Sequence, residues 1–221
     1  MKHYFIVPAR KNSKGFKNKN RILLSKTFKF LETIKWKDKV ILSTDDDFYK
    51  EICYKKKYLF LKRPKILSGD KISIKNVLIH AKKNLSLEND SYIWLIYIPI
   101  LGRKTIDYNL SKRLIEKSKF RIKSLCSFFP SKDHPFNTWK IKNNKLTKYI
   151  ENDIFRRQDL PTSLIHHHYI SVTSSDYLEK VNSELISKDT YPLIFNEKKR
   201  EKIHEIDTIL DYKKYLKYEK K

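Results

Sequence analysis

Short apolar runs alternate with longer amphipathic segments along the first half of the chain. The runs at residues 4–7, 39–43 and 92–98 are almost free of charge, which is typical of strands buried on both faces of a parallel sheet. Residues 46–57 and 73–87 repeat apolar side chains every three or four positions and are predicted to be helices. Strands that alternate with helices of this length indicate βαβ units. The pattern therefore predicts an α/β fold with a mostly parallel sheet flanked by helices.

Two further helices are predicted at residues 105–118 and 207–218. The positions expected to face the core are Ile106, Leu110, Leu114 and Ile115 in the first helix, and Ile209, Leu210 and Leu216 in the second. Residues 128–171 break the alternation with short β-like pieces, turn signals and four of the seven histidines. We interpret this segment as an arm inserted into a single domain of residues 1–221.

Composition adds charge to this picture. Hydrophobic residues make up 40% of the 221 residues, which is enough for a core and excludes a disordered chain. The net charge of +24 favours polyanionic partners such as nucleic acid or nucleotide phosphates. Codon drift in an AT-rich genome is an equally open explanation, because Lys, Ile and Asn abound while alanine occurs only as Ala9 and Ala81.

Cysteine usage and apolar run lengths indicate where the protein works. Cys53 and Cys126 are too few for a disulfide framework and fit a reducing compartment. The longest apolar stretch, residues 92–101, is about half of the roughly 20 residues that a membrane span needs. The N-terminus lacks the pattern of a signal peptide. We therefore expect a soluble cytoplasmic protein without a membrane partner.

The loop after the first strand concentrates positive charge. Residues 1–21 contain seven Lys or Arg and no Asp or Glu. Ligands of α/β sheets bind beyond the carboxyl ends of the strands, which is where this loop lies. Gly15 allows a tight turn, Ser13 offers a hydroxyl, and Arg10, Lys14 and Lys19 can neutralise a polyphosphate. The sequence predicts a phosphate site here, although it lacks the Walker and Rossmann motifs. The alternative is a solvated basic loop.

Five stretches in order resemble the acylneuraminate cytidylyltransferases, also called CMP-sialic acid synthetases. Residues 7–20 contain VPAR, SKG and KN and are similar to the family signature. Residues 42–46 (LSTDD) and 63–70 (RP followed by SGD) resemble its next two motifs. Residues 155–161 (FRRQDLP) resemble its sugar-side segment, and residues 205–208 (EIDT) its acidic metal motif. The resemblance spans nearly the whole chain.

The resemblance implies a Rossmann-like nucleotide-diphospho-sugar transferase fold and a Mg²⁺-dependent reaction. Family members transfer CMP from CTP to the anomeric hydroxyl of a 2-keto sugar acid and release pyrophosphate. Such acids, for example sialic, legionaminic or pseudaminic acid, enter surface glycans. The resemblance also implies a homodimer in which the arm at residues 128–171 reaches over the partner's sugar site.

The resemblance and the residue chemistry together give the candidate site. Arg63 would reach the nucleotide and Asn20 the ribose or base; a solvated arginine and a turn-forming asparagine are the alternatives. The expected nucleotide-binding residues are Ala9, Arg10, Ser13, Lys14, Gly15, Lys19, Asn20 and Arg63. The expected catalytic residues are Arg10, Lys14, Lys19 and Asp207.

Two carboxylates are the expected metal ligands. Glu205 and Asp207 are two residues apart, so on a strand both carboxylates would face the same way and share one Mg²⁺. Capping of the following helix is the alternative for Asp207. Asp45, Asp46 and Asp47 also open a helix, and we interpret them as caps rather than ligands.

The sugar side departs from the family pattern. Residues 98–104 (IPILGRK) replace a segment whose glutamine reaches the sugar, and residues 166–170 read HHHYI. We expect the nucleotide chemistry to be kept and the acceptor to differ. The expected acceptor-binding residues are Arg157, Gln158, His166, His168 and Tyr169. A zinc site at the histidine run is less favoured than a polar sugar pocket or packing, because the neighbouring sequence offers no third ligand.

Two other functions stay open from the sequence. The basic surface could serve a nucleic-acid-binding module, although no known nucleic-acid motif is present. A degenerate homologue that binds nucleotide without turnover is the second alternative, because the glutamine is lost. We favour the enzyme, with CTP and an acidic 2-keto sugar as partners and no nucleic acid.

Overall fold

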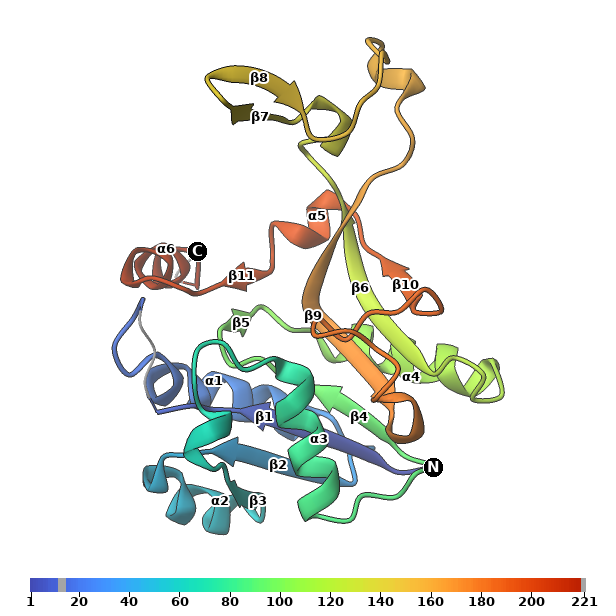
Figure 1. The fold of residues 1–221 in the computed structure, drawn as a ribbon. Helices are drawn as coiled ribbons and strands as arrows, with labels where there is room; N and C mark the ends of the chain where they lie inside the picture. The colour runs from blue at the N-terminus through green and yellow to red at the C-terminus, as the bar shows by residue number, and fades with distance from the viewer. Residues whose placement is uncertain (12–14, 220–221) are drawn as a thin grey trace.

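The computed structural model describes residues 1–11 and 15–219, and its centre is a seven-stranded sheet in the order β10-β6-β9-β4-β1-β2-β3 (Figure 1). The three predicted strands are β1 (His3–Pro8), β2 (Lys39–Thr44) and β4 (Tyr92–Leu95). β1 lies between the other two and is parallel to both. β3 (Leu59–Lys62) continues the parallel sheet beside β2.

The other half of the sheet contains β6 (Ser124–Pro130), β9 (Leu164–Ser174) and β10 (Tyr191–Ile194). β9 runs antiparallel to both of its neighbours, β4 and β6, whereas β10 is parallel to β6. The predicted α/β class with a mainly parallel sheet is confirmed, and β9 is its antiparallel strand.

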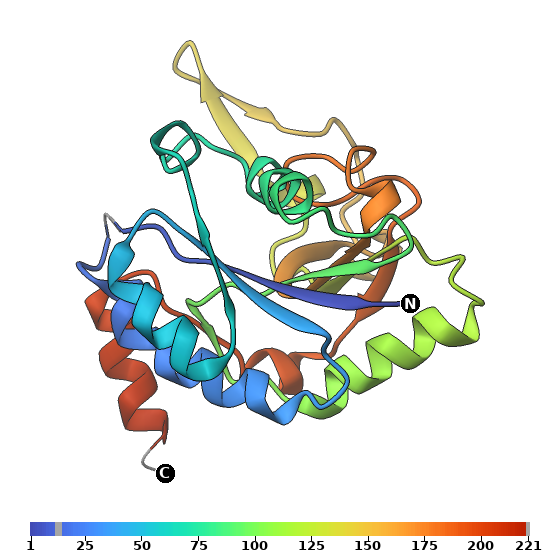
Figure 2. The same cartoon turned by 90° about the horizontal axis from the view of Figure 1, so that it is seen from below.

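Helices cover both faces of the sheet (Figure 2). α1, α2, α4 and α6 pack on one face and α3 on the other. In β1, Phe5 and Val7 belong to the first core and Tyr4 and Ile6 to the second. Burial on both sides is the physical reason for the uninterrupted apolar run in this strand. The helix bounds are α1 (Lys19–Thr33), α2 (Lys50–Lys56), α3 (Ile74–Asn84), α4 (Thr105–Lys117) and α6 (Ile209–Glu219).

The helix predicted at residues 46–57 is divided into the 3₁₀ turn η1 (Asp47–Tyr49) and α2. Asp46 caps η1 by accepting a hydrogen bond from the Phe48 amide, as expected for a carboxylate at this position. The strand predicted at residues 92–98 ends early. The chain then forms β5 (Ile100–Leu101), which pairs antiparallel with β11 (His204–Glu205).

The predicted core faces of two helices are partly wrong, because Ile115 is buried and Leu114 and Leu216 pack against the core, but the other predicted positions are exposed. In α4, Ile106 and Leu110 are exposed, and in α6 Ile209 and Leu210 are exposed. α4 instead buries Asp107, because the Tyr169 hydroxyl and the Lys199 ammonium bond to its carboxylate. The residues that these helices bury are Asp107, Tyr108, Ser111 and Ile115 in α4 and Tyr215 in α6.

The segment predicted as an arm, residues 128–171, projects only in part: residues 131–163 extend from the body, whereas residues 128–130 and 164–171 belong to β6 and β9 of the central sheet (Figure 1). It carries the antiparallel hairpin of β7 (Trp139–Lys142) and β8 (Lys145–Lys148). The short turns η3 (Pro135–Asn137) and η4 (Arg157–Asp159) flank the hairpin. Further along the chain, α5 (Glu197–Arg200) packs against β6.

Within the described part of the chain, no helix combines the length and apolar character that crossing a bilayer requires.

Candidate active site

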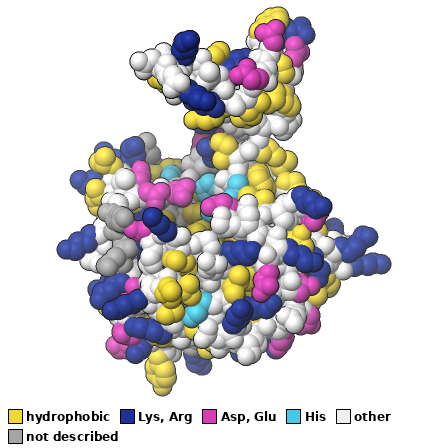
Figure 3. Space-filling model, viewed as in Figure 1, with side chains coloured by type: hydrophobic (Ala, Val, Ile, Leu, Met, Phe, Trp, Pro, Cys, Tyr) yellow, Lys and Arg dark blue, Asp and Glu magenta, His cyan; other side chains and the backbone are white. Residues whose placement is uncertain are grey.

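A pocket of about 550 Å³ opens at the carboxyl ends of β1, β3 and β4. This is the sheet edge at which α/β proteins bind ligands. Figure 3 shows histidine and acidic side chains gathered in a hollow between the arm and the body. The predicted site residues that line the pocket are Arg10, Gly15, Lys19, Asn20, Arg63, His168, Glu205 and Asp207.

The loop after β1 and the start of α1 form one wall. Asn20 donates a side-chain hydrogen bond to the Arg10 carbonyl oxygen at 2.8 Å, which fixes the loop to the first turn of α1. The Arg10 guanidinium is paired with Asp70. The Lys11 amide donates to the Asp45 carboxylate at 2.7 Å. Ser13 and Lys14, which we expected to contact phosphate, lie outside the described residues.

Ala9 does not line the pocket. Its side chain is fully buried, and its amide donates to the Ser43 carbonyl oxygen at 2.9 Å. Its own carbonyl oxygen accepts a hydrogen bond from the Thr44 hydroxyl. Both backbone polar groups are therefore used in joining β1 to β2, and the structure does not bring Ala9 to the pocket, contrary to the prediction.

Arg63 is a buried cation at the pocket wall, with only 5% of its surface exposed. Its Nη2 donates to the Ser43 carbonyl oxygen at 2.6 Å and its Nε to the Ser43 hydroxyl at 3.3 Å. Burial lowers the pKa of Arg63 to about 10, so the side chain keeps its charge at neutral pH. The alternative of a solvated arginine is excluded by this burial.

The C-terminal segment forms the facing wall. Asp207 accepts a hydrogen bond from Lys19 Nζ at 2.8 Å, across 188 residues of sequence. A Cβ atom on Gly15 would lie only 2.7 Å from the Asp207 carbonyl oxygen, so only glycine allows the loop to approach this segment so closely. The tertiary structure therefore joins the basic loop to the acidic motif.

Glu205 and Asp207 line the pocket together. Desolvation by the surrounding protein, followed by repulsion from Asp207, raises the pKa of Glu205. Two carboxylates close enough to repel each other are a donor set that fits a hard divalent cation such as Mg²⁺. Among the described contacts, the Asp207 carboxylate bonds to Lys19 and not to an amide of α6. Asp211 instead accepts from the Thr208 amide at 2.8 Å.

The predicted acceptor-binding residues are divided between three places. His168 lines the pocket and packs edge-on against Tyr97 with 4.9 Å between ring centroids. His166 lies behind it, with 4.4 Å between the two imidazole centroids. Tyr169 points to the opposite face of β9, where it is fully buried and donates to Asp107 at 2.5 Å. A direct contact of Tyr169 with substrate is therefore excluded, because its ring and hydroxyl belong to the core.

Arg157 and Gln158 belong to η4 on the arm and do not line this pocket. Arg157 borders a separate hollow of about 350 Å³ at the base of the arm, together with Phe155 and His134. Within one chain, the structure does not bring these two predicted residues to the main site.

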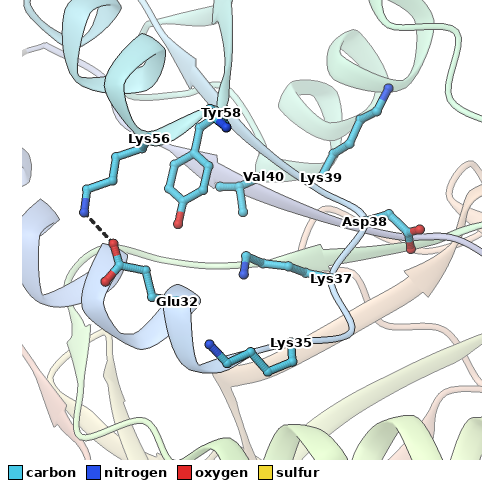
Figure 4. A pocket seen from close by; sticks show the side chains of 9 residues that line it. Glu32, Lys35, Lys37, Asp38, Lys39, Val40, Lys56 and Tyr58 are labelled. Carbon is cyan, nitrogen blue, oxygen red and sulfur yellow. Dashed lines mark hydrogen bonds and ion pairs between the residues drawn. The ribbon is translucent and has the colours of Figure 1, made fainter.

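Another hollow, of about 380 Å³, lies at the opposite, amino-terminal end of β2 (Figure 4). Its side chains are mainly lysines, and Lys56 is ion-paired with Glu32 across it. None of the predicted site residues lines it.

Tyr97 and Asp70 are among the pocket residues that the sequence did not predict. Tyr97 lies in the apolar run after β4 and looked like a core residue. Asp70 belongs to the SGD triplet of a motif that the sequence analysis singled out, so the motif already indicated a functional role for this stretch. Its ion pair with Arg10 could not be predicted, because the two residues are brought together only by the fold.

Solved structures with the same fold are nucleotidyltransferases. A CMP:2-keto-3-deoxy-manno-octonic acid synthetase complexed with CTP matches with a TM-score of 0.69 and 11% identity, over 97% of both chains. The 2-C-methyl-D-erythritol 4-phosphate cytidylyltransferase of Francisella tularensis matches with a TM-score of 0.61 and 15% identity, over 99% of both chains. At such low identity, these likenesses establish the fold.

Sequence relatives point to the same group of proteins. The N-acylneuraminate cytidylyltransferase of Streptococcus agalactiae serotype III (strain NEM316) is 28% identical over 171 residues, which is 72% of this chain and 40% of that relative. The match thus spans less than half the length of this curated relative. The family model described as "Cytidylyltransferase" matches residues 4–220. The chain therefore belongs to the cytidylyltransferase family, as the sequence motifs indicated.

Proposed function

We propose that this protein transfers CMP from CTP to the anomeric hydroxyl of a 2-keto sugar acid, a nonulosonic acid or a related compound, and releases pyrophosphate. One observation carries the proposal. Four cationic or amide side chains and two carboxylates line one pocket, although they come from segments far apart in the sequence. The residues concerned are Arg10, Lys19, Asn20, Arg63, Glu205 and Asp207.

The cations supply the charge neutralisation that phosphoryl transfer needs. Lys19 and Arg10 flank the loop at the amino-terminal end of α1, where the helix dipole also favours an anion. Arg63 is fixed by two bonds to Ser43, so its charge is oriented before any ligand binds. We assign these three residues to the CTP phosphates. Asn20 is held by the Arg10 carbonyl oxygen and lies beside them for the ribose or base.

Glu205 and Asp207 would hold Mg²⁺, which supplies charge stabilisation at the α-phosphate when bound. In the proposed reaction the acceptor oxygen forms a bond to the α-phosphorus. The bond from this phosphorus to the bridging oxygen of the pyrophosphate breaks, and the acceptor hydroxyl proton is released to solvent. Lys19 lies 2.8 Å from Asp207 and thus connects the carboxylates to the phosphate-binding wall.

The acceptor end of the pocket is formed by His168, Tyr97 and the segment after β4. Pro99 and Ile100 stand where the resembled family has a glutamine segment, so this wall is more apolar. We propose that the acceptor is an acidic sugar whose contacts on this side differ from those of sialic acid.

We also propose that the protein is a homodimer whose arm completes the partner's acceptor site. An isolated two-stranded hairpin is marginally stable in water. The β7–β8 hairpin nevertheless exposes Trp139, Ile141 and Leu146, which favours a covering surface from another subunit. This arrangement would give Arg157 and Gln158 an acidic ligand.

The decisive experiment is pyrophosphate release from each of the four nucleotides with Mg²⁺, against N-acetylneuraminic, legionaminic, pseudaminic and 3-deoxy-manno-octulosonic acids. We expect release with CTP and one class of acid. A protein that neither turns over nor gains thermal stability from CTP would contradict the proposal. Stabilisation by CTP without turnover across a broader acid panel would instead identify a nucleotide-binding homologue.

A further inference from the structure

Two histidines of β9 meet an acidic side chain from a distant turn. Ligand atoms of His166, His168 and Glu184 all lie within 4.8 Å of one another. Glu184 is 16 residues beyond His168 in the sequence, so the histidine run alone does not indicate it. The structure thus provides the third ligand that the sequence around the run lacks.

We propose that His166, His168 and Glu184 form a binding site for a single Zn²⁺ ion at the acceptor side of the pocket. Two imidazoles and one carboxylate, with a fourth position left for water or a ligand oxygen, are a donor set that zinc uses in proteins. The proposal stands on these three side chains and does not depend on the transferase function.

The spacing of His168 and Glu184 already suits a shared ion. His168 Nε2 lies 3.0 Å from Glu184 Oε2. Two ligands of a tetrahedral zinc with bonds near 2.0 Å lie about 3.3 Å apart. A small shift of the exposed Glu184 side chain would therefore admit the ion between them.

The surroundings of both histidines fit the same role. The other nitrogen of His168, Nδ1, lies 3.2 Å from the Ser171 hydroxyl, which can accept a hydrogen bond from Nδ1–H in the tautomer that leaves the Nε2 lone pair for a metal. His166 Nε2 is buried and has no hydrogen-bond partner among the described residues. A buried, unsatisfied nitrogen costs stability, and coordination would remove that cost.

The backbone around Glu184 is fixed rather than loose. The Asn182 side-chain oxygen accepts from the amides of Glu184 and Ile186, each at 2.9 Å. Leu185, between them, is buried, and its carbonyl oxygen accepts from Ser124 and Cys126 of β6. The turn therefore holds the carboxylate beside β9. Because His168 also lines the large pocket, the ion would lie at the wall of that pocket.

The test measures zinc and Co²⁺ binding by the full chain, purified without a histidine tag and stripped with a chelator. We expect one zinc per chain by elemental analysis after dialysis, and a visible absorption band with Co²⁺ that zinc removes. Glu184→Gln and His168→Asn should each lower zinc affinity by about tenfold or more. Glu184 is mostly exposed, so its substitution should leave the fold intact.

Two controls separate this site from others. His80→Asn removes a histidine of α3 outside the cluster and should bind zinc like the wild type. The double variant Glu205→Gln/Asp207→Asn removes the acidic pair and should also keep the zinc. The proposal is overturned if the wild type takes up no stoichiometric zinc, or if Glu184→Gln and His168→Asn bind it unchanged. None of these measurements uses CTP, so their outcome tests the zinc site independently of the proposed transferase activity.

Discussion

Asp207 provides the sharpest test of the proposed reaction, because its carboxylate can be neutralised with little change in shape. Asp207→Asn keeps an oxygen that can accept from Lys19, but it removes one of the two negative charges of the acidic pair. We expect turnover with Mg²⁺ to fall by a factor of the order of 10² or more, as for the loss of one preorganised charge-stabilising group. The fold should survive.

The expected cost to stability follows from the exposure of the ion pair. The Asp207 side chain is 66% exposed, whereas that of Lys19 is 12% exposed. An ion pair with one solvent-screened partner is worth less than about 1 kcal/mol. For a chain of 221 residues, this lowers the melting temperature by less than about 4 °C. A large loss of activity with a small loss of stability thus separates a metal ligand from a structural residue.

The assay is pyrophosphate release as a function of Mg²⁺ concentration, with the melting temperature measured on the same samples. Asp90→Asn is the matched control, since Asp90 is an exposed carboxylate in the turn before β4, at the opposite edge of the sheet. The control should behave like the wild type. Wild-type turnover and unchanged Mg²⁺ dependence in Asp207→Asn would refute the assignment of the acidic pair.

Three further predictions follow from burial and packing. Burial lowers the pKa of His3 from 6.5 to about 4, so the unfolded chain binds a proton that the native state rejects. Stability should therefore fall between pH 6.5 and 4, by up to about 3 kcal/mol from this residue, and urea unfolding of His3→Gln should show a flatter pH slope. If the pH dependence of the unfolding free energy is the same in His3→Gln and the wild type, His3 is not the group responsible for it. Gly15→Ala should weaken CTP binding by about tenfold or more in calorimetry, because its Cβ would meet the Asp207 carbonyl oxygen. Gly69→Ala, whose Cβ would lie 3.8 Å from its nearest neighbour, is the control, and equal affinities for both variants would contradict the steric argument. Ile141→Asp on the exposed face of β7 should convert the proposed dimer into monomers, as measured by light scattering. A variant that stays dimeric would show that this face of the arm is not part of the dimer interface.

Much of the candidate site could be predicted from local sequence. The basic stretch after β1, the acidic pair at Glu205 and Asp207, and Arg63 were found as motifs, and the fold brings the acidic pair, Arg63 and the described residues Arg10, Gly15 and Lys19 to one pocket. A loop that follows a buried parallel strand must lie at the ligand-binding edge of the sheet, so its position is fixed by topology. Local sequence could not show that Ala9 and Tyr169 are buried, because each is covered by residues from distant segments.

The sequence by itself determined the α/β class, since a strand buried on both faces needs an uninterrupted apolar run such as that of β1. The tertiary structure decided which polar groups meet. Asp107 is buried because Tyr169 and Lys199 reach it from other elements, and Ile106 on the same helix is left exposed. Glu184 joins the histidines of β9 only because the turn between η5 (Ser175–Tyr177) and β10 folds back over that strand. The periodicity of apolar residues indicates which side of a helix or strand is apolar. Contacts between charged and polar side chains that are distant in sequence depend on how the elements are placed in space.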